Sequence, residues 1–202
     1  MTRRNEPPAP SRITFTEFLP AEVAAITGLN VETQRVWRRR DQLPGSGTPA
    51  RFSPLDVGQV FIRYQFALHG LPPGQSQSIG ETYASMLLHF ALLNVDGACE
   101  VTGSNDDVDR YVSDFQDSEN PARQISGAQK SARYLWHADG EAVHETNDLS
   151  EIAEAKGHVS ASFIDLIEAG TRFGQMARRP LVTVEFAVDA GARRHRRLTG
   201  SL

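Results

Sequence analysis

The chain has 202 residues, 40% of them hydrophobic and 23% charged, which is typical of a globular protein with one large domain or two small ones. Its formal net charge of −4 taken alone would argue against a nucleic-acid partner, but the charge is unevenly distributed. Residues 1–70 hold nine basic and six acidic side chains, residues 71–170 hold five and 17, and residues 171–202 hold seven and two. This asymmetry is typical of a basic binding surface attached to an acidic body.

Composition also disfavours several classes of protein. No apolar run approaches the ~18 residues that a membrane-spanning helix requires. The first ten residues are polar and rich in proline, so no secretory signal is visible, and we expect a cytoplasmic, nucleoid-associated protein with no membrane partner. Cys99 is the only cysteine, which excludes an internal disulfide and a thiolate cluster.

Two short helices are predicted near the start of the chain. Residues 1–12 hold three prolines and three arginines without apolar periodicity, so we expect a disordered leader there. Good helix formers and a proline suited to the first turn predict a helix over residues 20–26, with Gly28 as its stop. Asn30 is a favoured N-cap for a second helix, which ends in three consecutive arginines at residues 38–40.

A turn-rich segment and a third helix follow. Residues 44–49 read Pro-Gly-Ser-Gly-Thr-Pro and must form a turn or loop. Ser53 is a favoured cap, Pro54 suits the first helical position and Asp56 suits the third. Apolar residues at helical spacing then predict a helix that stops at Gly70.

Beyond residue 70 the predicted elements are mixed. We expect a linker over residues 71–78, an apolar helix over 79–93, a hairpin around an Asp-Gly turn over 134–144, a helix over 160–177 and a strand over 181–188. The basic run at residues 193–197 belongs to a tail that either adds phosphate contacts or, as we favour, is a disordered, solvated end.

The two short N-terminal helices carry the strongest functional signal. Two helices separated by a turn, the second ending in arginines, form the sequence pattern of a helix-turn-helix. Arg35, Arg38 and Arg39 are three and four residues apart, so they share much of one helix face. Guanidinium groups fork onto guanine edges or phosphates, which favours a DNA-binding interpretation. The alternative is that the arginines only complement the helix dipole and keep the surface soluble.

On this stretch the chain resembles a known family. Residues 22–40, EVAAITGLNVETQRVWRRR, are similar to the N-terminal winged helix-turn-helix of the MerR family. Leu43-Pro44, Arg51-Phe52-Ser53 and Asp56-Val57 resemble the wing of that family and the start of the helix after it. The resemblance covers about residues 13–71, roughly a third of the chain, and several of its features coincide in order and spacing.

The resemblance implies that the helix over residues 31–40 enters the major groove while the wing touches the sugar-phosphate backbone. Arg35 stands where the family has its recognition-helix arginine, Thr33 where it has a small polar contact residue, and Arg51 at the wing arginine. Trp37 matches an aromatic residue that packs the helix onto the domain. The predicted DNA-contacting residues are Thr33, Gln34, Arg35, Arg38, Arg39 and Arg51.

The sequence also departs from the family pattern at three positions. Gln34 replaces a usual apolar residue, and Val36 replaces a frequent tyrosine that helps to hold phosphate. Asp41 replaces the glycine that ends the helix, but aspartate tolerates the left-handed conformation better than most residues do. We therefore expect the fold to survive while the base contacts differ.

The elements and the resemblance together predict an α+β fold, with a mainly α N-terminal winged helix-turn-helix and a small mixed α+β domain after it. The predicted organisation is a leader over residues 1–12, a DNA-binding domain over 13–71, a linking or dimerisation helix over 79–95, an acidic α+β domain of unknown role over 98–190 and a basic tail over 191–202. The apolar helix either forms a dimer contact or packs into the C-terminal core.

Other chemistry has weaker support. His137, His144 and His158 lack the ligand spacing of a zinc site, so we interpret them as surface or packing residues. Cys99 has no basic neighbours in the sequence and is interpreted as an ordinary thiol. The acidic cluster at residues 106–109 lacks the glycine and terminal glutamate of a calcium loop, which favours a solvated helix start. No catalytic motif is present, so we expect no enzyme activity, catalytic residue, metal or cofactor.

The sequence therefore leaves three functional hypotheses. The first is a sequence-specific transcriptional regulator of bacterial or phage origin that binds double-stranded DNA as a homodimer. In the second, the same fold serves an architectural or adaptor protein, such as an excisionase-like or phage packaging factor. The third is a protein-binding module whose arginines face an acidic partner instead of DNA. In the first hypothesis the C-terminal domain would serve ligand sensing, dimerisation or contact with a protein partner.

Overall fold

A computed structural model of the chain describes residues 9–129, 132–138, 142–155, 157–187 and 194–199. Its helices are α1 Pro20–Thr27, α2 Val31–Arg39, α3 Pro54–Leu68, α4 Gln77–Asn94, α5 Asn105–Asp117, α6 Asn120–Ser126, α7 Leu149–Glu154 and α8 Leu166–Ala177. Its strands are β1 Arg12–Phe15, β2 Cys99–Gly103, β3 Tyr134–Ala138, β4 His144–Thr146, β5 Ala161–Asp165, β6 Val182–Glu185 and β7 Arg194–Arg197. The mixed α+β prediction is therefore confirmed, and the N-terminal region is mostly helical.

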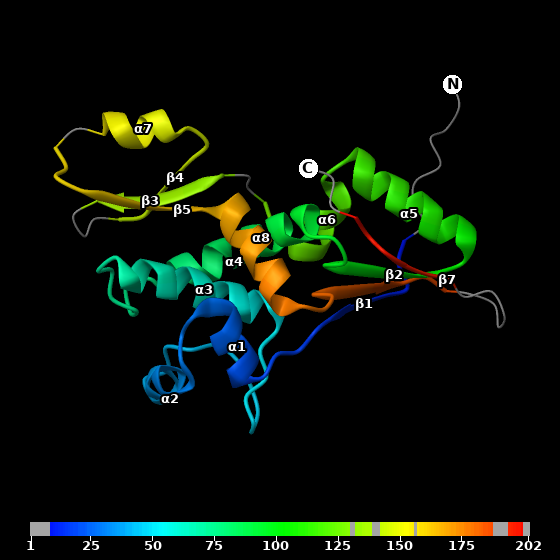
Figure 1. Cartoon of the computed structure of the whole chain (residues 1–202), viewed down its shortest axis with the longest axis horizontal. Coiled ribbons are helices and arrows are strands. Elements are labelled where there is room, and N and C mark those ends of the chain that lie inside the picture. The colour runs from blue at the N-terminus through cyan, green and yellow to red at the C-terminus, as the bar shows by residue number, and fades with distance from the viewer. Residues whose placement is uncertain (1–8, 130–131, 139–141, 156, 188–193, 200–202) are drawn as a thin grey trace.

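The molecule is elongated, with helices in the middle and a small sheet at each end (Figure 1). The three-stranded sheet has the order β4-β3-β5, and the four-stranded sheet has the order β1-β6-β2-β7. Helices α3, α4 and α8 pack between the sheets, while α1 and α2 lie below α3 in this view. Among the described helices, none is long and apolar enough to cross a bilayer.

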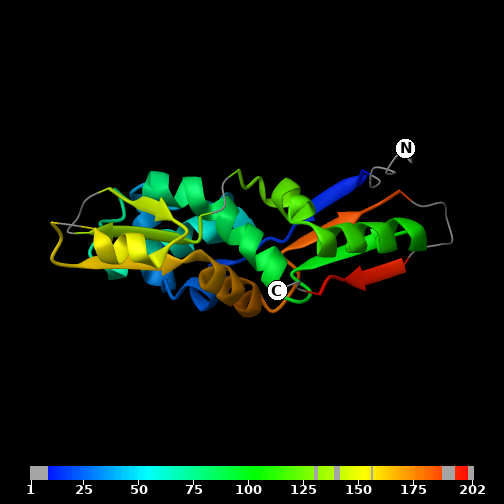
Figure 2. The same ribbon diagram turned by 90° about the horizontal axis from the view of Figure 1, so that it is seen from above.

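The four-stranded sheet joins segments from both ends of the chain. Strand β1 pairs antiparallel with β6, β2 pairs parallel with β6, and β7 pairs antiparallel with β2. Buried residues alternate with half-buried ones along β2 and β6, so one face of the sheet is apolar. Helix α5 covers that face (Figure 2) with Val108, Tyr111, Val112 and Phe115, all of which are buried.

Helix α4 forms the centre of the core. Its residues 86–93 are all buried, because α3, α6 and α8 pack around it. The approach of α8 is close: a Cβ atom at Gly170 would lie 2.7 Å from the Cβ of Phe90 and 2.9 Å from the carbonyl oxygen of Leu87. The apolar face of α4 is therefore used within the chain and is not available for a dimer contact.

Several predicted boundaries need correction. The helix predicted over residues 160–177 begins only at Leu166, because Ala161–Asp165 is strand β5. The carboxylate of Asp165 then accepts hydrogen bonds from the backbone nitrogens of Ile167 and Glu168 and caps α8. The predicted leader includes Arg12, which pairs with Glu185 in the sheet; residues 1–8 lie outside the described residues.

The predicted solvated tail is also wrong for Arg194–Arg197, which forms strand β7. Residues 191–193 and 200–202 of that tail lie outside the described residues. The hairpin of β3 and β4 is confirmed, although its turn at residues 139–141 is likewise outside them. The strand predicted at 181–188 is confirmed only for Val182–Glu185, which is β6; residues 186–187 are not in a strand, and residue 188 lies outside the described residues. The apolar helix predicted at 79–93 is α4.

Candidate nucleic-acid interface

Helices α1 and α2 are joined by a three-residue turn that the sequence specifies closely. Gly28 ends α1 in the left-handed conformation, with φ at 84°, as expected for its position. A Cβ atom there would also lie 3.2 Å from the Tyr64 ring. Leu29 is buried, and the Asn30 side chain caps α2 by accepting a hydrogen bond of 2.8 Å from the backbone nitrogen of Thr33.

Gln34 does not lie with the other predicted contact residues. Its side chain is only 2% exposed, and its Nε2 atom donates hydrogen bonds to the carbonyl oxygens of Pro20 at 2.9 Å and Leu29 at 2.8 Å. These bonds hold α2 against the start of α1 and the turn. The structure therefore removes Gln34 from the predicted DNA-contacting set. The apolar residue that the MerR family usually has at this position was the available signal that the side chain is buried.

The inner face of α2 rests on an aromatic residue and a buried cation. Trp37 is 6% exposed, in agreement with the prediction that it packs the helix onto the domain. The guanidinium carbon of Arg63 lies 5.4 Å from the centre of the Trp37 ring. Arg63 is 1% exposed and donates a hydrogen bond of 3.1 Å to the carbonyl oxygen of Pro73. Burial lowers the pKa of Arg63, while the charge of Glu81 raises it.

The outer face of α2 and its C-terminal end are basic and exposed. Arg35, Arg38, Arg39 and Arg40 are all exposed, and Thr33 is half-buried beside them. Arg35 forms an ion pair with Glu32, one turn earlier on the helix. The side chains of Arg39 and Arg40 form no hydrogen bond or ion pair with any described residue.

The residue that follows the end of α2 has the left-handed backbone conformation that the sequence predicts for it. Asp41 has a φ of 53°, a conformation that aspartate adopts more readily than most residues. The left-handed conformation expected for Asp41 is therefore present. The carbonyl groups at the end of α2 then accept hydrogen bonds from the backbone nitrogens of residues 40–42.

A short hairpin over residues 46–51 stands next to α2. The backbone nitrogen of Ser46 donates to the carbonyl oxygen of Arg51 at 3.1 Å, and the reverse bond measures 2.8 Å. Arg38 reaches across from α2 and donates a hydrogen bond of 3.2 Å to the carbonyl oxygen of Gly47. The hairpin and α2 are therefore tied together, and both lie along the lower edge of the molecule in Figure 1.

The base of this hairpin is fixed in the core. Phe52 is fully buried and pairs with Phe18, with backbone hydrogen bonds of 2.8 and 3.0 Å in the two directions. Because side chains alternate along an extended chain, Phe52 points into the core and its neighbour Arg51 points into solvent. The predicted wing arginine thus has a rigid support and an exposed side chain.

The weaker sequence signals have ordinary structural explanations. His137 is buried with its ring centre 5.4 Å from that of Phe66, and His144 lies 4.9 Å from the Trp136 ring. Among the described residues, no cluster of three or more histidine, cysteine, aspartate or glutamate side chains could hold a metal ion. Burial raises the pKa of Cys99 to about 12, so its thiol stays protonated and unreactive.

Comparison with known proteins assigns no family to this chain. A scan against models of protein families finds no match, and a search of curated proteins finds none either. The resemblance to the MerR family over residues 13–71 therefore stays a prediction. The residue that sequence reasoning missed is Arg63, and its signal was a cation placed among the apolar residues 60–62 of a predicted helix.

Proposed function

We propose that this chain is a sequence-specific double-stranded DNA-binding protein, a MerR-like transcriptional regulator of bacterial or phage origin. The observation that carries the proposal is the exposed arginine surface formed by α2 and the 46–51 hairpin. Residues 31–52 contain five arginines and only two acidic residues, Glu32 and Asp41, although the whole chain has a net negative charge. This positive region coincides with the pair of elements that a winged helix-turn-helix uses.

The dimensions of α2 suit the major groove. A helix with its side chains is about 10–12 Å across and the groove is about 12 Å wide, and the nine residues of α2 give a length of about 13 Å that can lie in it. In this arrangement Thr33 and Arg35 are the candidates for base contacts. Arg38 and Arg39 lie closer to the C-terminal end of α2 and would contact phosphate, as would Arg51 on the hairpin.

The Glu32 partner of Arg35 has a place in this proposal. Before DNA arrives, Glu32 holds the guanidinium of Arg35 on the exposed face of the helix. At an exposed site such a pair is weak, so the guanidinium can exchange its partner for a guanine edge at little cost. Glu32 would then be placed to accept a hydrogen bond from a cytosine amino group.

The position of the acidic residues supports the same orientation. Residues 71–170 carry 17 acidic and five basic side chains. Helix α5, which contains five of these acidic residues, lies at the opposite end of the molecule from α2 (Figure 1). The acidic region would thus stay away from the phosphates when α2 enters the groove.

The proposal is tested by selecting sequences from a randomised duplex library with the wild-type protein and measuring affinity by fluorescence anisotropy at several salt concentrations. Replacing Arg35 and Arg38 together by alanine should weaken binding by at least about 30-fold and reduce the salt slope by about 1–2. Arg110→Ala on α5 is the matched control and should change neither quantity. Selection that enriches no sequence, or a double variant with unchanged affinity and slope, would exclude the proposal.

We also propose that the chain binds DNA as a homodimer, because a two-fold protein matches a two-fold operator. The dimer contact must involve a surface other than the buried face of α4. Native mass spectrometry of the complex should show two chains for each duplex. Footprinting then separates the functions: a palindrome over a promoter supports a regulator, whereas a site at a recombination or packaging locus supports an architectural protein.

A further inference from the structure

A cavity of about 660 Å³ lies away from α2, where the C-terminal ends of α4 and α8 meet the four-stranded sheet. Segments 94–98 and 178–180, together with Arg197, form most of its lining. The volume lies in the range of sites that bind small molecules. Most of the lining is polar, and none of the lining residues is aromatic.

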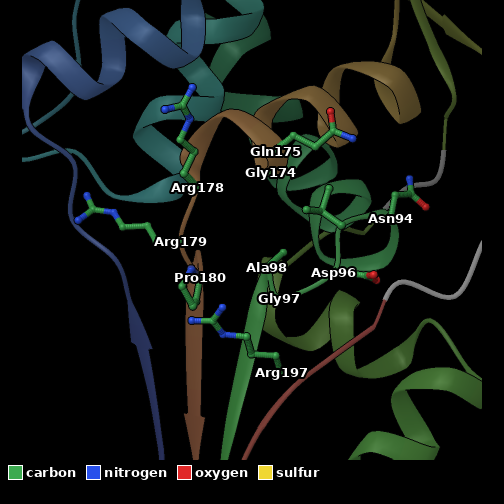
Figure 3. Close-up of a pocket in the computed structure, with 11 residues that line it drawn as sticks. Asn94, Asp96, Gly97, Ala98, Gly174, Gln175, Arg178, Arg179, Pro180 and Arg197 are labelled. Atoms are coloured by element: carbon green, nitrogen blue, oxygen red, sulfur yellow. The ribbon is translucent and has the colours of Figure 1, made fainter.

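The charged side chains of the cavity are mainly cationic. Three basic residues line it, Arg178, Arg179 and Arg197, and one acidic residue, Asp96. Arg197 extends across the cavity towards the side next to β1, where Arg178 and Arg179 lie, and Asn94 and Asp96 lie on the opposite side with their side chains directed away from the arginines (Figure 3). This arrangement gives the cavity one wall suited to an anionic group and another suited to neutral polar groups.

Two of these arginines are held in place by partners outside the cavity. Arg179 forms an ion pair of 2.9 Å with Glu22 of α1, and its guanidinium carbon lies 4.7 Å from the centre of the Phe18 ring. The Nε atom of Arg197 donates a hydrogen bond of 2.8 Å to Glu100, which leaves its two terminal nitrogens for another acceptor. Both arginines are exposed and their pairs are weak, so the pairs orient the two guanidinium groups and can rearrange when an anion binds.

The third arginine has an unusual backbone. Arg178 follows the end of α8 with a φ of 55°, in the left-handed conformation that glycine or asparagine usually supplies at this position. Its guanidinium forms no hydrogen bond or ion pair with any described residue. Strained residues of this kind gather at binding sites, where the side chain is needed for a function other than stability.

The opposite wall favours hydrogen-bond donors on the bound molecule. Helices α4 and α8 both end at the cavity, and helix C-termini carry partial negative charge on their free carbonyl groups. Hydroxyl groups on a bound molecule can donate hydrogen bonds to such carbonyl oxygens.

We propose that this cavity binds a small phosphorylated molecule that carries several hydroxyl groups and has the size of a sugar phosphate. Its phosphate would lie on the side of Arg178 and Arg197, and its hydroxyl groups would face the ends of α4 and α8. Guanidinium groups bind both phosphate and carboxylate through paired hydrogen bonds, and an excess of three arginines over one acidic residue favours phosphate because it carries more negative charge. The absence of aromatic residues from the lining disfavours a ligand held by base stacking.

Isothermal titration calorimetry with ribose 5-phosphate as the probe tests the proposal, with ribose and inorganic phosphate as comparisons. Ribose 5-phosphate should bind saturably, inorganic phosphate more weakly, and ribose without measurable heat. Arg178→Gln should raise the Kd for ribose 5-phosphate at least about tenfold. Arg172→Gln, an exposed arginine of α8 outside the cavity, should change it less than about twofold.

Arg178→Gly separates binding from folding. Glycine adopts a φ of 55° without strain, so this variant should melt no lower than the wild type and should still lose the probe. No saturable binding of ribose 5-phosphate at millimolar concentration, or unchanged affinity in both Arg178 variants, would overturn the proposal. It would also be overturned if the variants lost DNA affinity at least tenfold but kept the probe, because the arginines would then contact DNA phosphates. The calorimetry does not rest on the proposed function, so either proposal can fail alone.

Discussion

Two regions of the molecule are rich in arginine, and they present it in different ways. On α2 and the 46–51 hairpin the arginines stand on an exposed surface, where Arg35 is paired with Glu32 and Arg39 is unpaired among the described residues. In the cavity at the end of α8, Arg179 and Arg197 are each held by a carboxylate. A row of cations on an exposed surface can follow a long polyanion, whereas cations grouped around a hollow suit one small anion.

The two regions are also in direct contact, because Arg179 of the cavity forms an ion pair with Glu22 of α1, the helix that precedes α2. Strand β1 makes a second connection. It pairs with β6 in the sheet, and the chain then continues to Phe18, which pairs with Phe52 at the base of the hairpin. Variants in α2, in the cavity wall and in the buried core should therefore affect the two regions to different extents.

The largest expected effect comes from removing the support of α2. Trp37→Ala empties a buried site and leaves the Arg63 cation without the ring that it contacts. Unfolding in urea should show a loss of about 3–5 kcal/mol in the free energy of unfolding. DNA affinity should fall with it, because the arginine face of α2 loses its support, while binding of ribose 5-phosphate should persist in the molecules that remain folded.

Trp136→Ala is the comparison for that variant, since Trp136 is half-buried on β3 of the three-stranded sheet, away from α2. It should cost less stability and leave DNA affinity unchanged. If both tryptophan variants lowered DNA affinity equally, α2 would not depend on its own local packing.

A smaller effect should follow from changing the wall of the cavity. A Cβ atom at Gly174 would lie 2.7 Å from the Cγ2 atom of Val95, which lines the cavity, so α8 must move in Gly174→Ala. We expect a loss of about 1–3 kcal/mol in stability and weaker binding of ribose 5-phosphate. DNA affinity should stay within about twofold of the wild type. Gly74→Ala, where the nearest atom is 3.7 Å away, is the control and should have neither effect.

Two buried histidines in the core should make the stability of the protein depend on pH. Burial lowers the pKa of His89 in α4 despite the opposing charge of Glu119, and burial also lowers the pKa of His137 in β3. The unfolded chain therefore binds more protons than the folded chain below pH 6.5, and stability falls as the pH drops from there towards the folded pKa values. The slope approaches about 1.4 kcal/mol per pH unit for each histidine.

Urea unfolding at pH 7.5, 6.5 and 5.5 measures this loss in the free energy of unfolding. His89→Leu should make the curve flatter over this range, because one of the two buried imidazoles is gone. Equal stability of the wild type at all three pH values would contradict the assignment of buried, neutral histidines.

The contrast between the regions extends to what the sequence could predict. Helices α1, α2 and α3 were predictable because their signals are local: Pro20 and Gly28 bound α1, Asn30 caps α2, and Ser53 with Asp56 caps α3. The arginines of α2 followed from helical spacing alone. Each of these inferences needs no more than about ten consecutive residues.

The cavity and the sheet beneath it could not be predicted in this way. Arg12 pairs with Glu185, and nothing in the short segment around either residue identifies the other as its partner. The cavity combines residues 94–98, 178–180 and 197, which come together only when β2, β6 and β7 have paired. Strand β5 was mistaken for helix because its apolar residues suit both periods over so short a run.

Gln34 gives the smallest expected effect on DNA binding, and it distinguishes the sequence-based prediction from the structure. In Gln34→Leu two hydrogen bonds to Pro20 and Leu29 are lost, but a buried carboxamide with an unpartnered Oε1 atom is lost as well. These effects oppose each other, so stability should fall by about 1 kcal/mol or less in urea unfolding. Because a buried side chain does not contact DNA, affinity for the selected duplex should stay within about twofold of the wild type. Thr33→Val, which changes an accessible position on the same helix, is the matched comparison and should weaken binding more. A loss of tenfold or more in Gln34→Leu, with stability unchanged, would mean that Gln34 turns outward to contact DNA, and α2 would then have to rotate in the complex.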